Sequence, residues 1–351
     1  MTREEKLAAF DPNGVGAAHA QVFGLPFSHA ESRVVILPVP WDATASYEAG
    51  SSRGPEAIRK ASPQLDLDDP DVPDSWQAGF FMLQSSPEWQ QRNRVLRPRV
   101  SEHLRLLESG AEPDDSLPQR VNEETEALRK WVFERTEETL HAGKIPGLLG
   151  GDHGTALGAM QAGLAQYPAM GILQIDAHAD LRDAYEGFRH SHASIMHNAL
   201  DAGVTCLVPV GLRDVCQAEN QILSADPRIS AFPQHVLDTR RFNGENWKAC
   251  VADIIAALPQ DVWVSFDIDG LDPSLCPNTG TPVPGGLSFA EVSFLLGELM
   301  HSGRLIIGFD LTEVSPDPDD RHEWDANVGA RILYRLCSVA VGSQSGKNNG
   351  S

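Results

Sequence analysis

The chain has 351 residues, of which 41% are hydrophobic and 22% are charged, and its formal net charge at pH 7 is -21. This length allows one large α/β domain or two ordinary ones, and the strong negative charge argues against nucleic acid or an anionic membrane surface as a partner. No apolar stretch approaches the roughly 20 residues of a membrane span, and the charged N-terminus lacks the apolar core of a signal peptide. The five cysteines have no paired spacing, so we expect reduced thiols and a cytoplasmic enzyme.

The first 32 residues predict an irregular N-terminal extension rather than a core element. Gly, Pro and small residues surround Asp11 and the segment 23–27, and such residues favour turns. We expect this extension to wrap the surface of the domain or a neighbouring subunit, with a disordered tail as the alternative. The folded domain then covers residues 33–342, and the polar residues 343–351 predict a flexible tail.

Buried-strand runs alternate with helical patterns throughout the folded domain. Strands are predicted at 33–40, 145–150, 170–175, 206–211, 261–266 and 304–311, with a short one at 229–232. Helices are predicted from Gly54, around 100–107, and at 121–141, 155–167, 247–258, 288–300 and 327–341, the sixth with a capping box of Ser288 and Glu291. This alternation is typical of a parallel sheet with right-handed crossovers. No repeat or linker is visible, so we expect one domain.

Three short stretches that follow predicted strands carry six metal-type ligands. They are His153 in the first, Asp176, His178 and Asp180 in the second, and Asp267 and Asp269 in the third. A spacing of two starts the side chains of a strand toward one side. A single Asp after a strand often caps a helix or turn, but burying carboxylates and an imidazole together without a cation is costly. Six such ligands suit divalent first-row metals and can hold two ions if carboxylates bridge, so we interpret them as a binuclear metal site.

The loop 41–50 follows the first predicted strand. Loops after parallel strands face the ligand side of open α/β sheets, so this loop is a candidate wall of the pocket. The candidate residues are Trp41, Asp42, Thr44, Ser46 and Tyr47. Ordinary hydrogen bonding within the loop explains each of them equally well.

The three ligand stretches resemble the motifs of the ureohydrolase family, which contains arginase, agmatinase, formiminoglutamase and guanidine hydrolase. The resemblance continues through Pro38–Trp41, Gly54–Arg59 and Asp310–Pro316 and covers residues 34–337. It implies a three-layer α/β/α sandwich on a mostly parallel sheet and two divalent metal ions, Mn2+ or alternatively Ni2+. It also implies hydrolysis of a guanidino carbon with release of urea, and assembly of the chain into trimers or hexamers.

The resemblance also implies roles for individual residues. One ion would be bound by His153, Asp176, Asp180 and Asp267, and the other by Asp176, His178, Asp267 and Asp269. Asp180 would in addition orient the attacking water, and Glu313 would pair with the guanidinium in a charge-assisted bidentate geometry. His192 would give a proton to the leaving amine, because an imidazole serves as acid or base near neutral pH. His190 competes for this role, although His192 matches the family position better.

The substrate is expected to be a small cationic guanidino compound. Substrate contacts are predicted for Thr44, Tyr47, Arg189 and Trp324. The loop after Asp180 lacks the Asn and Ser that hold the amino-acid end of arginine in arginase, which argues against arginine. Because the bulky side chains of Trp41, Tyr47 and Trp324 are candidates to close the pocket, guanidine and agmatine are the leading substrates.

Two other kinds of reaction stay open. Arg182 and Arg189 are candidates to recognise a carboxylate, as formiminoglutamase-type hydrolysis of an amidine would require. A binuclear hydrolase outside the family is the second alternative, but a phosphate-ester enzyme would need a basic clamp for its substrate, and only these two loop arginines offer one.

Overall fold

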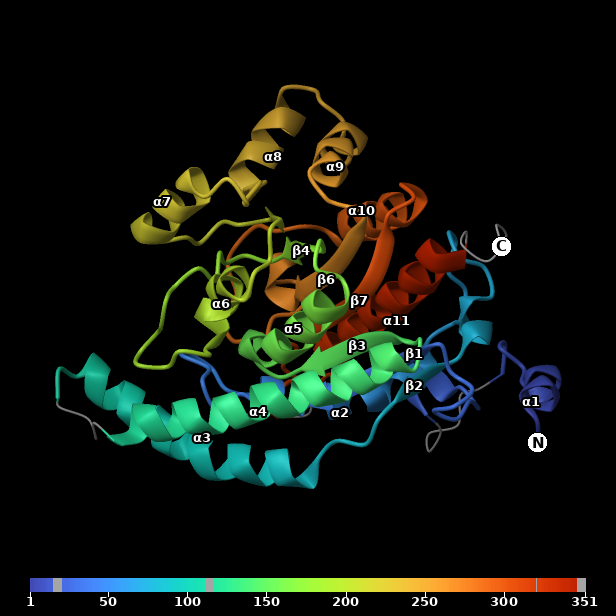
Figure 1. The fold of residues 1–351 in the computed structure, drawn as a ribbon, viewed down its shortest axis with the longest axis horizontal. Coiled ribbons are helices and arrows are strands. Elements are labelled where there is room, and N and C mark those ends of the chain that lie inside the picture. Colours follow the sequence, from blue (N-terminus) through green and yellow to red (C-terminus); the bar gives the residue numbers. More distant parts are fainter. Residues whose placement is uncertain (15–20, 112–115, 320, 346–351) are drawn as a thin grey trace.

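A parallel sheet forms the middle layer of the computed structural model, which describes residues 1–14, 21–111, 116–319 and 321–345 (Figure 1). Its seven strands within the described residues are β1 (Val34–Val39), β2 (Phe80–Met82), β3 (Ile145–Gly150), β4 (Gly171–Ile175), β5 (Leu207–Val210), β6 (Asp261–Asp267) and β7 (Leu305–Thr312). Their order across the sheet is β2-β1-β3-β7-β6-β4-β5, and every pairing is parallel. Apart from the residues at 81 and 261, the strands are buried throughout, as expected for a parallel sheet covered on both faces.

Helices cover the sheet in two layers. Their bounds are α1 (Arg3–Ala9), α2 (Gly54–Ala61), α3 (Pro87–Glu108), α4 (Ser116–His141), α5 (Leu157–Gln166), α6 (Ile195–Asp201), α7 (Gln217–Ala225), α8 (Gln234–Phe242), α9 (Trp247–Ala256), α10 (Phe289–His301) and α11 (Trp324–Ser345). One hydrophobic cluster joins the sheet to α2, α9, α10 and α11, and a second joins it to α3, α4, α5 and α6. The predicted three-layer α/β/α sandwich is therefore confirmed.

The predicted elements match the structure best where the sequence pattern is long. The strand 145–150 and the helix that begins after Ser288 with its capping box are confirmed. The predictions missed β2 and the helices α1, α6, α7 and α8, and they placed only part of α3. Residues 229–232 form two isolated bridges to β5 rather than a strand. The last helix begins at Trp324 and continues to Ser345, so the predicted tail is helical at 343–345, and residues 346–351 lie outside the described part.

The N-terminal segment contributes to the core, contrary to its predicted irregular role. Val22, Phe23, Leu25 and Phe27 are buried within the hydrophobic cluster that includes α11. The ring of Phe23 packs edge to face on Phe80 and Tyr334, and its backbone N–H donates to Ser62 Oγ at 2.8 Å.

None of the helices of the described residues has the length and apolar character needed to span a membrane.

Candidate metal centre

The six predicted ligands lie at or just after the carboxyl ends of three strands, β3, β4 and β6, and Glu313 follows a fourth, β7. β3, β7, β6 and β4 are neighbours in the sheet, and parallel strands present their carboxyl ends at one edge, where ligands bind in open α/β sheets. His153 follows β3, the segment 176–180 follows β4, and Asp267 ends β6. Glu313 follows β7 directly, so all three ligand stretches and the predicted guanidinium partner converge at this edge.

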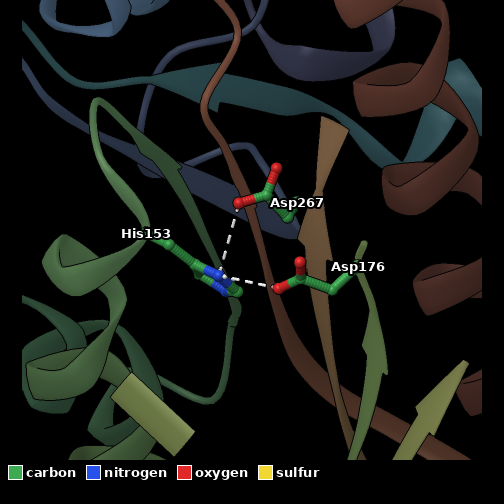
Figure 2. A group of neighbouring side chains, drawn as sticks. All are labelled: His153, Asp176 and Asp267. Atoms are coloured by element: carbon green, nitrogen blue, oxygen red, sulfur yellow. Dashed lines mark ion pairs between the residues drawn. The ribbon is translucent and has the colours of Figure 1, made fainter. Parts of the chain in front are cut away.

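His153 stands at the centre of a first group of ligands (Figure 2). Its Nδ1 atom lies 3.2 Å from Asp176 Oδ2, 3.0 Å from Asp180 Oδ2 and 3.4 Å from Asp267 Oδ2. This nitrogen is buried and has no well-formed hydrogen bond among the described residues. An imidazole nitrogen surrounded by carboxylate oxygens without such a bond is arranged as a metal ligand is.

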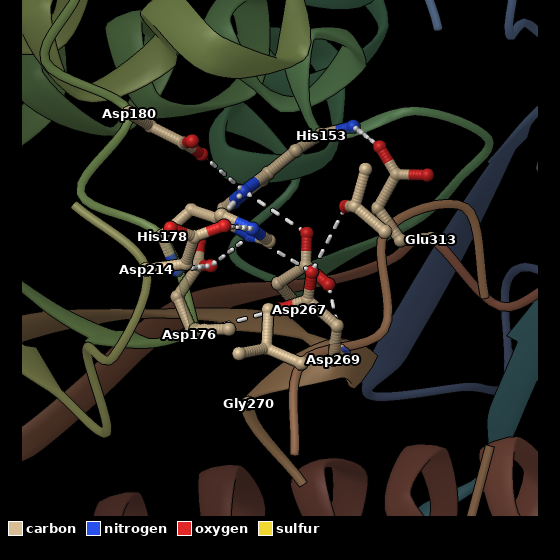
Figure 3. A network of polar contacts seen from close by, with 12 residues as sticks. His153, Asp176, His178, Asp180, Asp214, Asp267, Asp269, Gly270 and Glu313 are labelled. Carbon is tan, nitrogen blue, oxygen red and sulfur yellow. Dashed lines mark hydrogen bonds and ion pairs between the residues drawn. The ribbon is translucent and has the colours of Figure 1, made fainter. Parts of the chain in front are cut away.

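His178 belongs to a second group, which shares Asp176 with the first. His178 Nδ1 lies 3.0 Å from Asp269 Oδ2 and 3.7 Å from Asp176 Oδ1. Asp176 therefore directs Oδ2 toward His153 and Oδ1 toward His178, as Figure 3 shows. One carboxylate that faces two ligand groups with different oxygens is the arrangement of a bridging ligand between two metal ions.

The electrostatics of the six ligands also favour cations. Burial and the nearby carboxylates of Asp269 and Asp176 raise the pKa of Asp267 well above its usual range. Burial and the charge of Asp176 raise the pKa of Asp180 to about 7. Crowded, buried carboxylates resist ionisation unless a positive charge lies among them. Two divalent cations would supply that charge, and the donor set of carboxylate oxygens and imidazole nitrogens fits them.

A chain of hydrogen bonds behind His153 fixes the orientation of its ring. His153 Nε2 lies 2.8 Å from Ser265 Oγ, which donates to Asp310 Oδ1 at 3.0 Å. The other oxygen of Asp310 accepts from Trp263 Nε1 at 2.6 Å. With Nε2 donating to Ser265, Nδ1 keeps its lone pair for coordination. Ser265 and Asp310 were not predicted as part of the site, although Ser265 precedes Asp267 by two positions on a strand and so starts toward the same side.

Glu313 is held rigidly beside the ligand groups. Its backbone is left-handed, with φ 61°, and its Oε1 atom accepts the backbone N–H of His153 at 2.8 Å. Burial and the charge of Asp152 raise the pKa of Glu313 well above the usual range. A buried carboxylate with raised pKa gains stability from a cationic partner, which is what the predicted contact with a guanidinium would provide.

The two candidate histidines point to different places. His192 lines a cavity of about 240 Å3 that also contains His178 and Asp180, and its Nε2 atom lies 3.1 Å from Ser46 Oγ. His190 instead faces α4, with Nε2 3.9 Å from Glu126 Oε2. Burial, followed by the charge of His178, lowers the pKa of His192 to about 4, so its imidazole is neutral at pH 7. The structure thus brings His192, and not His190, to the cavity of the predicted ligands His178 and Asp180.

The predicted substrate residues lie outside the wall of this cavity. Thr44 is buried beside it and donates from Oγ1 to Asp152 Oδ2 at 2.6 Å. Tyr47 is 72% exposed. Trp324 is 48% exposed, and its indole N–H donates to the carbonyl of Ser274. Arg189 is exposed. Trp41, the third aromatic side chain of the predicted closure, packs in the core. The prediction that Trp41, Tyr47 and Trp324 close the pocket is therefore wrong in this structure.

Other residues form the wall instead. The described residues that line the cavity with the two histidines and Asp180 are Ser46, Arg182, Tyr185, Ala193, Asp214, Val215, Cys216, Glu219 and Thr281. Asp214 Oδ2 lies 3.9 Å from His178 Nε2, and the guanidinium of Arg182 stacks on the ring of Tyr185 at 4.6 Å. Of these, Ser46 had been predicted as a wall residue, and that prediction is confirmed. A larger cavity of about 740 Å3, between α2, α3 and the start of α11, contains none of the six ligands.

Comparison with known proteins places this geometry in context. The family model described as "Arginase family" matches residues 32–338. The chain is 33% identical over 320 residues to N(1)-aminopropylagmatine ureohydrolase of Thermus thermophilus, which covers 91% of this chain and 93% of that protein. It is 29% identical over 289 residues to agmatinase of Pyrococcus horikoshii, covering 81% and 84% of the two chains. The structure of proclavaminate amidino hydrolase from Streptomyces clavuligerus has the same fold, with a TM-score of 0.74, 22% identity and coverage of 95% and 100%.

Proposed function

Because the chain belongs to the arginase family and is one of its ureohydrolases, we propose that it hydrolyses an aminoalkylguanidine, agmatine or a longer homologue, to urea and the corresponding amine. The observation that carries the hydrolytic chemistry is the carboxylate of Asp176, which faces both ligand groups with different oxygens. The cavity beside these groups supports a substrate with a second cation beyond the guanidinium.

Two divalent ions are expected at the ligand groups, Mn2+ first and Ni2+ as the alternative, since both accept these ligands. We expect one ion on His153, Asp176, Asp180 and Asp267, and the other on Asp176, His178, Asp267 and Asp269. When bound, such ions activate water for attack on a poor electrophile. Four carboxylates contribute -4 and two divalent ions +4, so the ligand groups become neutral. The charge of Glu313 then remains for the substrate.

Three side chains of this chain serve the guanidinium end of the substrate. Glu313 pairs with the cation through a charge-assisted hydrogen bond, and its rigid backbone holds the planar group in place. Asp180 lies 3.0 Å from His153 Nδ1 and orients the attacking water by accepting a hydrogen bond. His192 is neutral at pH 7, so its ring accepts a proton from the reacting water and passes it to the leaving amine, as a general base and then acid.

The far end of the cavity supports an aminoalkyl chain. The cavity of about 240 Å3 exceeds what guanidine alone would fill, and the aromatic residues expected to shrink it lie elsewhere. The side chain of Asp214 is 73% exposed at the mouth of the cavity, and its ion-pair partner among the described residues is the ring of His178, at 3.9 Å. The carboxylate is therefore available to a second cation. The similar proteins named above act, by their names, on agmatine and on N(1)-aminopropylagmatine.

Arg182 favours a second candidate, a guanidino acid or an amidine that carries a carboxylate. Its guanidinium lines the cavity, and its nearest carboxylate, Glu219, lies 4.0 Å from Nε. Glu219 is already occupied by the backbone N–H groups of Leu181 and Cys216. The positive charge of Arg182 is therefore only partly balanced within the protein, and a carboxylate of the substrate would balance the rest.

Urea release separates these candidates. The protein is loaded separately with Mn2+ and Ni2+ and assayed with agmatine, N(1)-aminopropylagmatine, guanidine, 4-guanidinobutyrate and arginine, and formamide is measured with formiminoglutamate. We expect urea from the two aminoalkylguanidines. Asp214→Asn should raise KM for agmatine and leave guanidine turnover unchanged. Product from a carboxylate substrate alone, abolished by Arg182→Ala, would overturn the aminoalkyl proposal.

A further inference from the structure

The loop that follows β1 is held from outside the catalytic centre by helix α3. In Figure 1, α3 lies beside α4 on one side of the sheet, away from α10 and α11. Two residues of α3 that are one turn apart, Asn93 and Arg97, nevertheless bond to residues 42–45 of the loop. These contacts join a helix that holds none of the six ligands to a loop at the wall of the cavity.

Asn93 fixes the beginning of the loop. Its Oδ1 atom accepts the backbone N–H of Asp42 at 3.0 Å, and its Nδ2 atom donates to Asp42 Oδ1 at 2.8 Å. The other carboxylate oxygen of Asp42 accepts the N–H groups of Gly50 and Ser52 at 2.9 and 3.2 Å. These four bonds are buried or partly buried, so Asn93 and Asp42 together close the loop into one defined shape.

Arg97 fixes the middle of the loop. Its Nη1 atom donates to the carbonyl of Ala45 and approaches the carbonyl of Ala43 at 3.5 Å. Its Nε atom is buried without a hydrogen-bond partner among the described residues. Arg97 is half-buried, and the carboxylates of Asp42 and Asp152 attract its charge. Its guanidinium therefore stays in place beside the loop, where its hydrogen bonds restrain the carbonyls of Ala43 and Ala45.

The residue after Ala45 contacts the proposed proton carrier. Ser46 Oγ lies 3.1 Å from His192 Nε2, while the other ring nitrogen of His192 is buried without a partner among the described residues. On the other side of Ala45, Thr44 donates to Asp152, the neighbour of His153. The path of the chain through residues 44–46 therefore decides where the ring of His192 is held.

We propose that Asn93 and Arg97 are positioning residues for hydrolysis, which hold the loop 42–46 so that Ser46 orients the imidazole of His192. This inference rests on the proposed function, because it gives His192 the proton transfer. General acid–base groups contribute about 10²–10⁴-fold to rate, and small misplacements can cost up to about 100-fold. Loosening the loop should therefore lower kcat without removing metal or substrate.

The central variant is Arg97→Ala, compared with Arg97→Lys and with Arg105→Ala as a matched control. Arg105 lies on the same helix, is exposed, and its guanidinium pairs with Glu102 on the same helix. We expect Arg97→Ala to lower kcat for urea release by about 10- to 100-fold, with KM and bound metal little changed. Arg97→Lys should restore part of kcat, because an ammonium still donates to the carbonyl of Ala45. Ser46→Ala should resemble Arg97→Ala.

Two further measurements test whether the loss of kcat in Arg97→Ala acts through His192. In the His192→Ala background, Arg97→Ala should have no additional effect on kcat; a full additional loss would overturn the proposal. Hydrogen exchange of residues 41–50 and the imidazole NMR signal of His192, assigned from His192→Ala, should change in Arg97→Ala and not in Arg105→Ala. Unchanged exchange and signal would also overturn it. If wild-type protein releases no urea from any substrate but these signals move, the proposed function fails while the positioning of His192 stands.

Discussion

Replacing Asp176 by Asn tests whether one carboxylate serves two ions. The substitution keeps the shape of the side chain, but the new amide nitrogen cannot coordinate, and whichever way the amide lies, one of the two ligand groups loses an oxygen. The charge of the site with two divalent ions changes from zero to +1. Substituting a residue that only hydrogen-bonds to a metal ligand already costs about 10- to 100-fold in metal affinity. We therefore expect metal affinity to fall by at least about 100-fold when this direct ligand is changed.

That loss has a measurable effect on stability. At a free metal concentration 100 times Kd, each bound ion stabilises the fold by about 2.7 kcal/mol, and a 100-fold weaker site contributes only about 0.4 kcal/mol. For two ions the difference is about 5 kcal/mol, visible as a loss of the metal-dependent increase in Tm. Metal content by mass spectrometry should fall together with urea release. Asp272→Asn is the control. Asp272 follows β6, as Asp269 does, but its side chain accepts the backbone N–H of Ser274 instead of facing the ligand groups. A variant that keeps two ions and full activity would refute the bridging role.

Three further substitutions test other parts of the site. Glu313→Gln should lower kcat/KM by about 100- to 1,000-fold with metal retained, and wild-type activity would exclude a contact with the guanidinium. His192→Ala should lower kcat by about 100-fold or more, whereas His190→Ala should be close to wild type, and the reverse result would mean that the wrong histidine was chosen. Ser265→Ala should weaken metal binding by about 10- to 100-fold, since the ring of His153 loses its contact to Asp310; unchanged metal titrations would show that this chain of bonds is dispensable.

The grouping of the six predicted ligands could be foreseen because each of their positions depends on local sequence. Asp176, His178 and Asp180 follow a strand at a spacing of two, and the carboxyl ends of parallel strands meet at one edge whatever the loops do. Their six positions therefore needed no knowledge of distant contacts. The long apolar strands and the capping box at Ser288 were predictable for the same reason.

The direction of the loop residues was not predictable in this way. His190 and His192 are two apart and would share a side in a strand, but His192 begins a short 3-10 turn and the two rings diverge. Upstream, Glu186 and Gly187 both have positive φ in a tight turn that pairs Tyr185 with Phe188. Such turns redirect the chain by amounts that periodicity does not encode.

Long-range contacts also determine the conformations of two other segments that were predicted wrongly in whole or in part, the loop 41–50 and residues 22–27. The path of the loop 41–50 depends on Asn93, which lies 51 positions from Asp42. Phe23 is buried because it meets Phe80 and Tyr334 from distant parts of the chain. The apolar residues 22–27 are interrupted by Gly and Pro, so they lack the period that would have indicated a core element.

Asp180 and Glu313 show how the fold supports a site that is unfavourable by itself. Both have left-handed backbones, with φ 55° and 61°, and such conformations cost about 1–3 kcal/mol each. Several hydrogen bonds stabilise these backbone conformations. The carbonyl of Asp180 accepts two N–H groups from α6, the backbone N–H of Glu313 donates to the carbonyl of Gly151, and the carbonyl of Glu313 accepts from Thr279 Oγ1. The crowding of carboxylates is a separate cost, which the neighbouring histidines reduce and which bound divalent cations would offset further. Because the backbone strain is balanced by protein contacts alone, we expect removal of metal to lower stability while leaving these two side chains in place.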